Sequence, residues 1–169
     1  MKPQQQDKKK FSALIEKNQA LIHKVTLVYA NSPADRDDLF QEICLRLWRS
    51  YADCREESQF GTWMYRVALN TAISTLRKRK NSPVVHTLEV EKPIAAEPST
   101  NTGDIERLYE AISKLSHIEK AIILLWLEEK GYEEIASIVG ITKSNVSVRL
   151  VRIKRKLKEL ASKINGEKP

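Results

Sequence analysis

The sequence of 169 residues predicts an all-α fold of two small helical domains joined by an acidic flexible linker. Glycine and proline are scarce, at 5 and 6 residues, and aromatic residues make up 7% of the chain, which disfavours a β-sandwich. Apolar residues recur at helical spacing on both sides of a polar, acidic central stretch. The length suits one or two small domains.

The formal net charge of +7 is divided unevenly along the chain. Residues 1–80 carry 15 basic and 9 acidic side chains, and residues 107–169 carry 13 and 8, whereas residues 81–106 carry one and five. This middle segment also contains three of the six prolines, a composition typical of an extended linker. We therefore expect a helical domain over 1–80, a linker over 81–106 and a second helical domain over 107–169.

The positive excess favours a polyanionic partner, either nucleic acid or an anionic membrane surface. The longest apolar run has seven residues, whereas a membrane-spanning helix needs about 20, and the N-terminal residues lack the apolar core of a secretory signal. We expect a cytoplasmic protein without direct membrane insertion. The three histidines are isolated, no His-Cys cluster has metal-ligand spacing, and no glycine-rich phosphate loop occurs, so we expect no metal and no cofactor.

Three helices are expected in the first domain. The sequence Asn-Ser-Pro at 31–33 interrupts the first apolar periodicity, and the next helix is expected to begin near Asp35 or Asp37, because carboxylates suit a helix N-terminus. The expected helices cover about residues 11–30, 35–51 and 60–80, with a polar loop over 53–58.

An aromatic cluster follows the polar loop. Phe60, Trp63 and Tyr65 stand close to Asn70 and precede the basic run at 77–80. Rings that stack on bases beside cations that follow phosphates are typical of a surface for single-stranded nucleic acid. The simpler interpretation is a three-helix bundle with a solvated basic tail. It accounts for the apolar positions but explains the aromatic cluster less well.

In the second domain, residues 105–129 are expected to form one or two amphipathic helices. Ser116 followed by Glu119 fits a capping box and divides this segment near Leu115. The next stretch, residues 131–150, is typical of a helix-turn-helix. It has a small residue for a close helix crossing, a glycine for a left-handed turn, an apolar plug, an N-cap and two core anchors: Ala136, Gly140, Ile141, Thr142, Val146 and Leu150.

The second helix of this motif would enter the major groove of duplex DNA. Residues 143–158 contain seven basic side chains and no acidic one, which predicts DNA binding that weakens steeply with salt. The simpler alternative is a solvated basic helix, but solvated helices usually mix both signs. The residues expected on the outer side are Lys143, Ser144, Asn145, Ser147, Val148, Arg149 and Arg152.

Together the two halves resemble the extracytoplasmic-function sigma factors of bacterial RNA polymerase. ADRDDLFQEICLRLW at 34–48 is similar to a helix of that family's region 2, and FGTWMYRVALNTA at 60–72 is similar to its promoter-melting segment. LSHIE at 115–119 and YEEIA at 132–136 are similar to region 4. Two blocks in this order with an acidic linker are a more specific match than a helix-turn-helix alone.

The resemblance implies three binding surfaces, together with core RNA polymerase, duplex and melted promoter DNA, and an anti-sigma factor as partners. The surface for a coiled coil of the largest polymerase subunit would comprise Asp35, Asp38, Leu39, Gln41, Glu42 and Leu45. The surface that opens the −10 element and holds its non-template strand would comprise Phe60, Trp63, Asn70, Thr71, Ser74, Arg77 and Lys78. The surface for the −35 element would comprise Lys143, Ser144, Asn145, Ser147, Val148, Arg149, Val151 and Arg152.

Three departures from the family pattern concern the preferred DNA sequence. Ser144-Asn145-Val146 stands where the family often has Gly-Thr-Val, and Val148-Arg149 stands where it often has a Ser-Arg pair. Ser147 is neutral where the family usually has a basic residue. Val148 offers an apolar contact, as to a thymine methyl group, rather than a hydrogen bond. The helix-turn-helix is retained, but the promoter sequence does not follow from the family pattern.

Two other function classes are alternatives. A stand-alone helix-turn-helix regulator would bind duplex DNA without polymerase, but it leaves the blocks at 35–48 and 60–70 without purpose. A nuclease using Asp35, Asp37 or Asp38 with a divalent ion would be an enzyme, but a helix start explains these carboxylates better. We expect a sigma factor that catalyses no covalent step.

Overall fold

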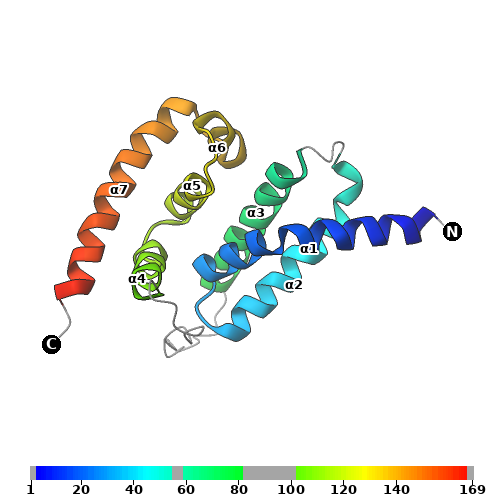
Figure 1. The fold of residues 1–169 in the computed structure, drawn as a ribbon, viewed down its shortest axis with the longest axis horizontal. Helices are drawn as coiled ribbons and strands as arrows, with labels where there is room; N and C mark the ends of the chain where they lie inside the picture. Colours follow the sequence, from blue (N-terminus) through cyan, green and yellow to red (C-terminus); the bar gives the residue numbers. More distant parts are fainter. Residues whose placement is uncertain (1–2, 55–58, 82–101, 167–169) are drawn as a thin grey trace. The chain divides into compact units, whose positions relative to one another are not determined.

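The computed structural model describes residues 3–54, 59–81 and 102–166 and consists, over these ranges, of seven α-helices and one 3-10 turn (Figure 1). The predicted all-α fold is confirmed. The chain divides into two compact units, Met1–Glu91 and Lys92–Pro169. Most of the predicted linker lies outside the described residues. In the described ranges, no helix is long and apolar enough to cross a membrane.

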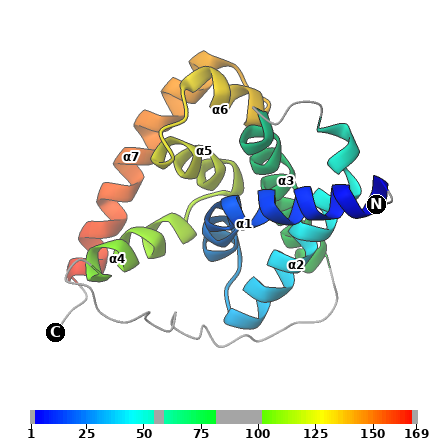
Figure 2. The same cartoon turned by 45° about the vertical axis from the view of Figure 1, so that its right-hand side comes forward.

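The first unit contains α1 (Pro3–Tyr29), α2 (Pro33–Arg49), the 3-10 turn η1 (Tyr51–Asp53) and α3 (Phe60–Lys80). Figures 1 and 2 both show α2 and α3 side by side and antiparallel, with α1 lying across them. The core consists of apolar side chains from all three helices, among them Ile22, Val25, Leu39, Ile43, Leu47, Met64, Ala68 and Ala72.

Local sequence signals set the boundaries of α2. The backbone of the N-cap Ser32 is extended, and its side chain accepts a hydrogen bond from the Asp35 amide at 3.1 Å. Pro33 occupies the first helical turn, where its missing N–H costs nothing. The helix therefore begins two residues before the expected Asp35, because the cap residue precedes the carboxylates.

The second unit contains α4 (Thr102–Ser113), α5 (His117–Leu127), α6 (Tyr132–Val139) and α7 (Lys143–Gly166). Helix α4 begins inside the stretch assigned to the linker from sequence. The predicted capping box is present: the Ser116 side chain accepts from the Glu119 amide, and the Glu119 carboxylate accepts from the Ser116 amide at 3.0 Å. It starts α5 after the Leu115 break.

Helices α6 and α7 form the predicted helix-turn-helix. Gly140 ends α6 in the left-handed conformation with φ of 79°, which a residue with a Cβ adopts only at a cost. Thr142 caps α7, since its hydroxyl accepts from the Asn145 amide at 3.2 Å. The inward side of α7 is fixed in the core by Val146, Leu150 and Ile153, all buried.

Candidate nucleic-acid interface

The outward side of α7 carries every residue predicted to meet the −35 element. Because Val146, Leu150 and Ile153 face the core, the positions between them face solvent. Val148 and Val151 are 50% and 59% exposed, an unusual exposure for apolar side chains on a helix with an apolar side already packed. The other predicted residues are exposed or partly exposed: Lys143, Ser144, Asn145, Ser147, Arg149 and Arg152.

Three of the seven cations at 143–158 contact groups of their own domain. Lys143 pairs with Glu133 at 2.9 Å, and Lys156 pairs with Glu119 at 2.5 Å. Lys154 lies 4.0 Å from the centre of the Trp126 ring, a cation–π contact. These pairs join α7 to α5 and α6, so they hold the helix in place as well as contributing positive charge.

Within the described ranges, the other four cations of this stretch make no ion pair or hydrogen bond with another helix that would hold α7 in place. Arg149 donates from Nε to Asn145 Oδ1 at 3.2 Å, an i to i+4 contact that orients the guanidinium along the outward side of α7. Among the described residues, no ion pair or hydrogen bond engages the side chains of Arg152, Arg155 and Lys158. These groups are available to phosphates.

The acidic partners of these ion pairs have perturbed pKa values. Partial burial by itself raises the pKa of Glu119, but hydrogen bonds from Lys156 and from the Ser116 backbone and side chain outweigh it and lower the pKa. A hydrogen bond from Lys143 lowers the pKa of Glu133. Both carboxylates are therefore held in the charged form that keeps the lysines paired.

A second stripe runs along α3. Its successive members are seven, four and three residues apart, which places them on one side of the helix: Trp63, Asn70, Ser74 and Arg77. Asn70 and Arg77 are exposed, and Trp63 and Ser74 are partly exposed. Exposed Lys78 adjoins this stripe, which therefore brings together a ring, an amide and two cations.

Two residues predicted for this strand surface lie in the core. Phe60 is 3% exposed and Thr71 is 1% exposed. The Thr71 hydroxyl donates to the Val67 carbonyl at 2.7 Å, and the Phe60 ring lies 5.4 Å from the Trp63 ring. In this structure, Phe60 supports the partly exposed Trp63, and Thr71 bonds its own helix.

The residues predicted for polymerase docking lie on α2 but divide between its two sides. Asp38, Gln41 and Leu45 are exposed and share the outward side, and Leu39 is 4% exposed and packs inward. The two further acidic residues of the set have cationic partners: Glu42 pairs with Arg46 at 2.9 Å, and Asp35 pairs with Arg79 at 2.9 Å. The second of these bridges joins the start of α2 to the end of α3.

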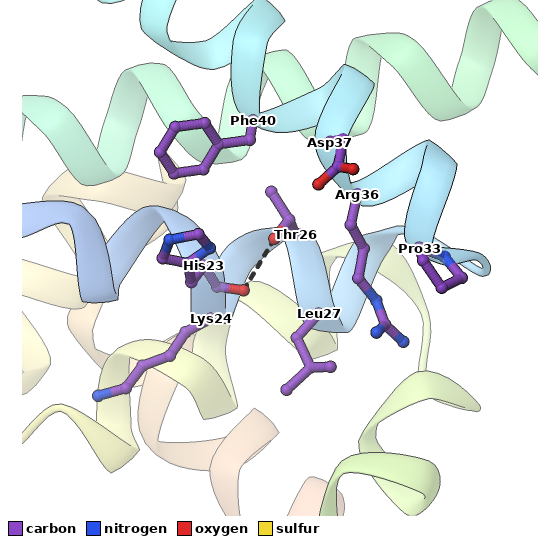
Figure 3. A pocket seen from close by; sticks show the side chains of 8 residues that line it. All are labelled: His23, Lys24, Thr26, Leu27, Pro33, Arg36, Asp37 and Phe40. Atoms are coloured by element: carbon purple, nitrogen blue, oxygen red, sulfur yellow. Dashed lines mark hydrogen bonds between the residues drawn. The ribbon is translucent and has the colours of Figure 1, made fainter. Parts of the chain in front are cut away.

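A groove of about 400 Å³ opens between α1 and α2 (Figure 3). The His23 ring stacks on Phe40 with centroids 4.7 Å apart, and Thr26 donates to the His23 carbonyl at 2.9 Å. None of the residues predicted for the three binding surfaces lines it. Sequence reasoning missed it because its walls come from two helices: His23, Lys24, Thr26, Leu27, Pro33, Arg36, Asp37 and Phe40.

The carboxylates at the start of α2 do not gather with other acidic or sulfur ligands. Across the described ranges, no three His, Cys, Asp or Glu side chains lie close enough together to hold a metal ion. Asp35 faces Arg79 and Asp37 lines the groove.

Comparison with known proteins identifies both halves. Residues 14–82 match the model of Sigma-70 region 2, and residues 105–157 match the model of Sigma-70 region 4. The chain is 31% identical over 166 residues to the ECF RNA polymerase sigma-E factor of Haemophilus influenzae, covering 88% of this chain and 86% of that one. It is 28% identical to the RNA polymerase sigma factor SigV of Bacillus subtilis, covering 90% and 91%.

The fold also matches a solved sigma factor. The sigma factor RpoE of Bartonella quintana, crystallised with the anti-sigma factor NepR, superposes with a TM-score of 0.75 at 22% identity, covering 91% of this chain and 98% of that one. The chain therefore belongs to the extracytoplasmic-function sigma factors of the sigma-70 family.

This membership decides between the function classes left open by the sequence. An extracytoplasmic-function sigma factor directs transcription initiation by RNA polymerase and is a non-catalytic subunit of that enzyme. A stand-alone helix-turn-helix regulator would account for region 4 but not for region 2, whose match covers α2, α3 and residues 14–29 of α1.

Proposed function

We propose that this sigma factor uses three separate helix faces, one for each of its binding tasks. The outward side of α7 contacts the −35 element, the stripe on α3 holds the opened −10 strand, and the outward side of α2 docks on core RNA polymerase. The observation that carries the proposal is that each set contains a contiguous exposed stripe at helical spacing. The proposed domains cover 1–80 and 107–169, and the proposed linker covers 81–106, in which the first residues of α4 lie.

On α7, the apolar and the cationic groups have different tasks. Val148 and Val151 meet base edges, because apolar side chains recognise the thymine methyl group in the major groove. Arg149 and Arg152 contact base edges or the phosphates beside them. The shorter polar groups and the first cation surround them at the start of the helix: Lys143, Ser144, Asn145 and Ser147.

On α3, the opened strand is held by stacking, hydrogen bonds and charge. Trp63 offers a ring to a base, and the Asn70 amide donates and accepts. Arg77 and Lys78 follow the phosphates, with Ser74 between them and the amide. Such contacts must offset the few kcal/mol that unstacking a base costs. Phe60 and Thr71 serve this surface indirectly, by fixing Trp63 and the helix.

On α2, Asp38, Gln41, Glu42 and Leu45 provide an acidic and amide edge around one apolar side chain. Such an edge complements a basic coiled coil on the polymerase. Leu39 supports this face from the core, and Asp35 holds the start of the helix through Arg79.

We propose two further features by analogy with the family. Because the Bartonella quintana relative is bound by an anti-sigma factor, this chain is expected to have an anti-sigma partner of its own. We also place it in the cytoplasm, where core polymerase and promoter DNA are found.

The experiment uses holoenzyme assembled from core polymerase and the full chain, on promoters selected by that holoenzyme from random DNA. Three quantities are measured: core affinity, affinity for the closed duplex, and permanganate reactivity of the −10 strand. Gln41→Ala with Leu45→Ala should lower core affinity, and Arg149→Ala should lower duplex affinity. The control is Lys114→Ala, at an exposed site outside all three faces.

The effects of the variants on the three measured quantities test whether each face is assigned correctly. With core saturating in the duplex measurement, and core and promoter both saturating in the permanganate measurement, each variant should impair its own step and leave the other two close to those of the unaltered protein. If the α2 variant binds core normally, or if Arg149→Ala changes duplex affinity no more than Lys114→Ala, the corresponding face is assigned incorrectly.

A further inference from the structure

Three aromatic side chains from separate elements meet at one end of the first unit. The Phe11 ring of α1 lies 5.1 Å from the Trp48 ring of α2 and 5.2 Å from the Tyr51 ring of η1, in edge-to-face contacts. The Trp48 and Tyr51 rings are nearly parallel, with centroids 6.3 Å apart. None of these residues belongs to the three faces described above.

These contacts anchor the first part of α1, but they do not close the cluster. Phe11 and Tyr51 are partly exposed, and 36% of Trp48 remains open to solvent. A cluster that served only as an anchor would gain most by burying its indole, because aromatic rings offer the largest apolar area of any side chain. An open indole is therefore a surface available to a partner.

Exposed cations stand next to this cluster in the sequence. Lys8, Lys9 and Lys10 precede Phe11 on α1, and Arg49 follows Trp48 on α2, all of them exposed. No ion pair or hydrogen bond among the described residues engages these four side chains. Residues 7–11 and 48–53 carry these four cations and two acidic side chains, Asp7 and Asp53, so the net charge of these two segments is positive. Rings interleaved with unpaired cations fit a single-stranded nucleic acid, because rings stack on bases and cations follow phosphates.

The position of the cluster fits this partner. The turn η1 lies in the connection between the end of α2 and the start of α3, and Figures 1 and 2 both show it near the first turn of α3 and the N-terminal part of α1. The first turn of α3 carries the Phe60–Trp63 contact of the proposed −10 surface. A strand bound at Trp63 can therefore extend toward the end of the bundle where the cluster lies.

We propose that this aromatic and basic surface, made by Phe11, Trp48, Tyr51, Lys8, Lys9, Lys10 and Arg49, binds the opened DNA strand next to the −10 element. Trp48 stacks on a base, Phe11 and Tyr51 hold its ring, and the cations follow the phosphates. The inference rests on the proposed −10 role of α3. It extends the proposed contact between the protein and the opened DNA strand beyond that helix.

The test measures holoenzyme binding to fork templates whose single strand either ends at the −10 element or continues for several nucleotides on one side or the other. Changing Lys8, Lys9 and Lys10 together to Gln should weaken binding to one extended template about tenfold and reduce its salt slope by about two. Trp48→Leu should weaken the same template about fivefold or more, whereas Trp48→Phe should retain most of the affinity. Lys17→Gln, an exposed site on the same helix, is the control.

Several outcomes overturn the inference. Equal losses on the short and the extended templates would show that the surface does not meet the flanking strand. Lower affinity for core polymerase itself would assign the surface to protein docking. Unchanged binding by both the lysine and the Trp48→Leu variants, with folding verified by thermal melting, would leave the cluster as an anchor only. A failure of the −10 role of α3 is recognised separately, because Trp63→Ala would then bind the short template normally.

Discussion

The proposed DNA contacts of the two exposed valines of α7 can be tested one methyl group at a time. Val148 and Val151 are about one turn apart on the outward side, so their methyl groups can reach neighbouring base steps. Burial of one methyl group contributes about 0.8 kcal/mol, a factor of about four in affinity. Replacing thymine by deoxyuridine in the −35 element removes the DNA methyl group and leaves every hydrogen bond intact.

We expect at least one such replacement to weaken duplex binding about fourfold in the unaltered protein. The loss should disappear when Val148 or Val151 is changed to Ala, because the apolar contact is already missing. Ile105→Ala, at an exposed apolar position on α4, should keep the full loss. Titrations of labelled duplex measure the effect, and a loss that persists in both valine variants would show that neither side chain contacts a thymine methyl group.

A second test at this scale uses the lowered pKa of Glu119. Since its pKa is lower in the folded protein than in the unfolded chain, the charged carboxylate contributes stability above its ordinary pKa, and that contribution is lost as the pH falls through the folded value. Glu119→Gln should lower the free energy of unfolding by about 0.5–1 kcal/mol at neutral pH. The difference between variant and unaltered protein should vanish in acid. A pH-independent difference in urea unfolding would mean that the charge of Glu119 is not responsible.

At the scale of elements, the turn between α6 and α7 depends on one glycine. A Cβ at Gly140 would meet no atom within 4 Å, so the cost of Gly140→Ala is the left-handed backbone alone, about 1–2 kcal/mol. Gly61→Ala is the matched control, because Gly61 lies within α3, outside the left-handed region, and has equally open space. Thermal unfolding should show a lower Tm for the first variant but not for the second. Equal Tm shifts would contradict this explanation of the turn.

The helix caps and the turn of the second unit could be predicted from the sequence, but the start of α1 could not. Ser116, Glu119, Gly140 and Thr142 were predictable as caps and turn, because each acts on backbone groups within a few residues. Helix α1 begins at Pro3, eight residues before the expected start at Phe11. The segment before Phe11 has no apolar periodicity, and its helix is continued by residues of good intrinsic helix propensity such as Gln and Lys.

Burial was harder to predict than helix position. Leu39, Phe60 and Thr71 match family motifs for binding, yet all three side chains lie in the core of the first unit. A family motif includes residues on both the buried and the exposed sides of a helix. A match to the motif therefore does not distinguish a residue that contacts the partner from a residue that packs in the core. The α1–α2 groove and the Phe11–Trp48–Tyr51 cluster depend on contacts between distant segments, which a one-dimensional pattern does not contain.

Across the whole molecule, positive and negative charges are concentrated in different parts of the chain. The two helical parts are basic and the segment over 81–106 is acidic. In the second part, some cations at 143–158 contact α5 or α6, whereas Arg152, Arg155 and Lys158 make no ion pair or hydrogen bond among the described residues and are proposed to contact DNA phosphates. The number of phosphate contacts inferred from salt dependence should therefore be smaller than the count of basic residues.

We propose that the chain, bound to core polymerase, opens promoter DNA through the stripe on α3. Permanganate reactivity of −10 thymines in complexes of holoenzyme and promoter measures this opening. The unaltered protein should make these thymines reactive. Trp63→Ala and Asn70→Ala should retain core and duplex binding but leave the thymines protected. Normal reactivity in both variants, or protected thymines with the unaltered protein, would contradict the account.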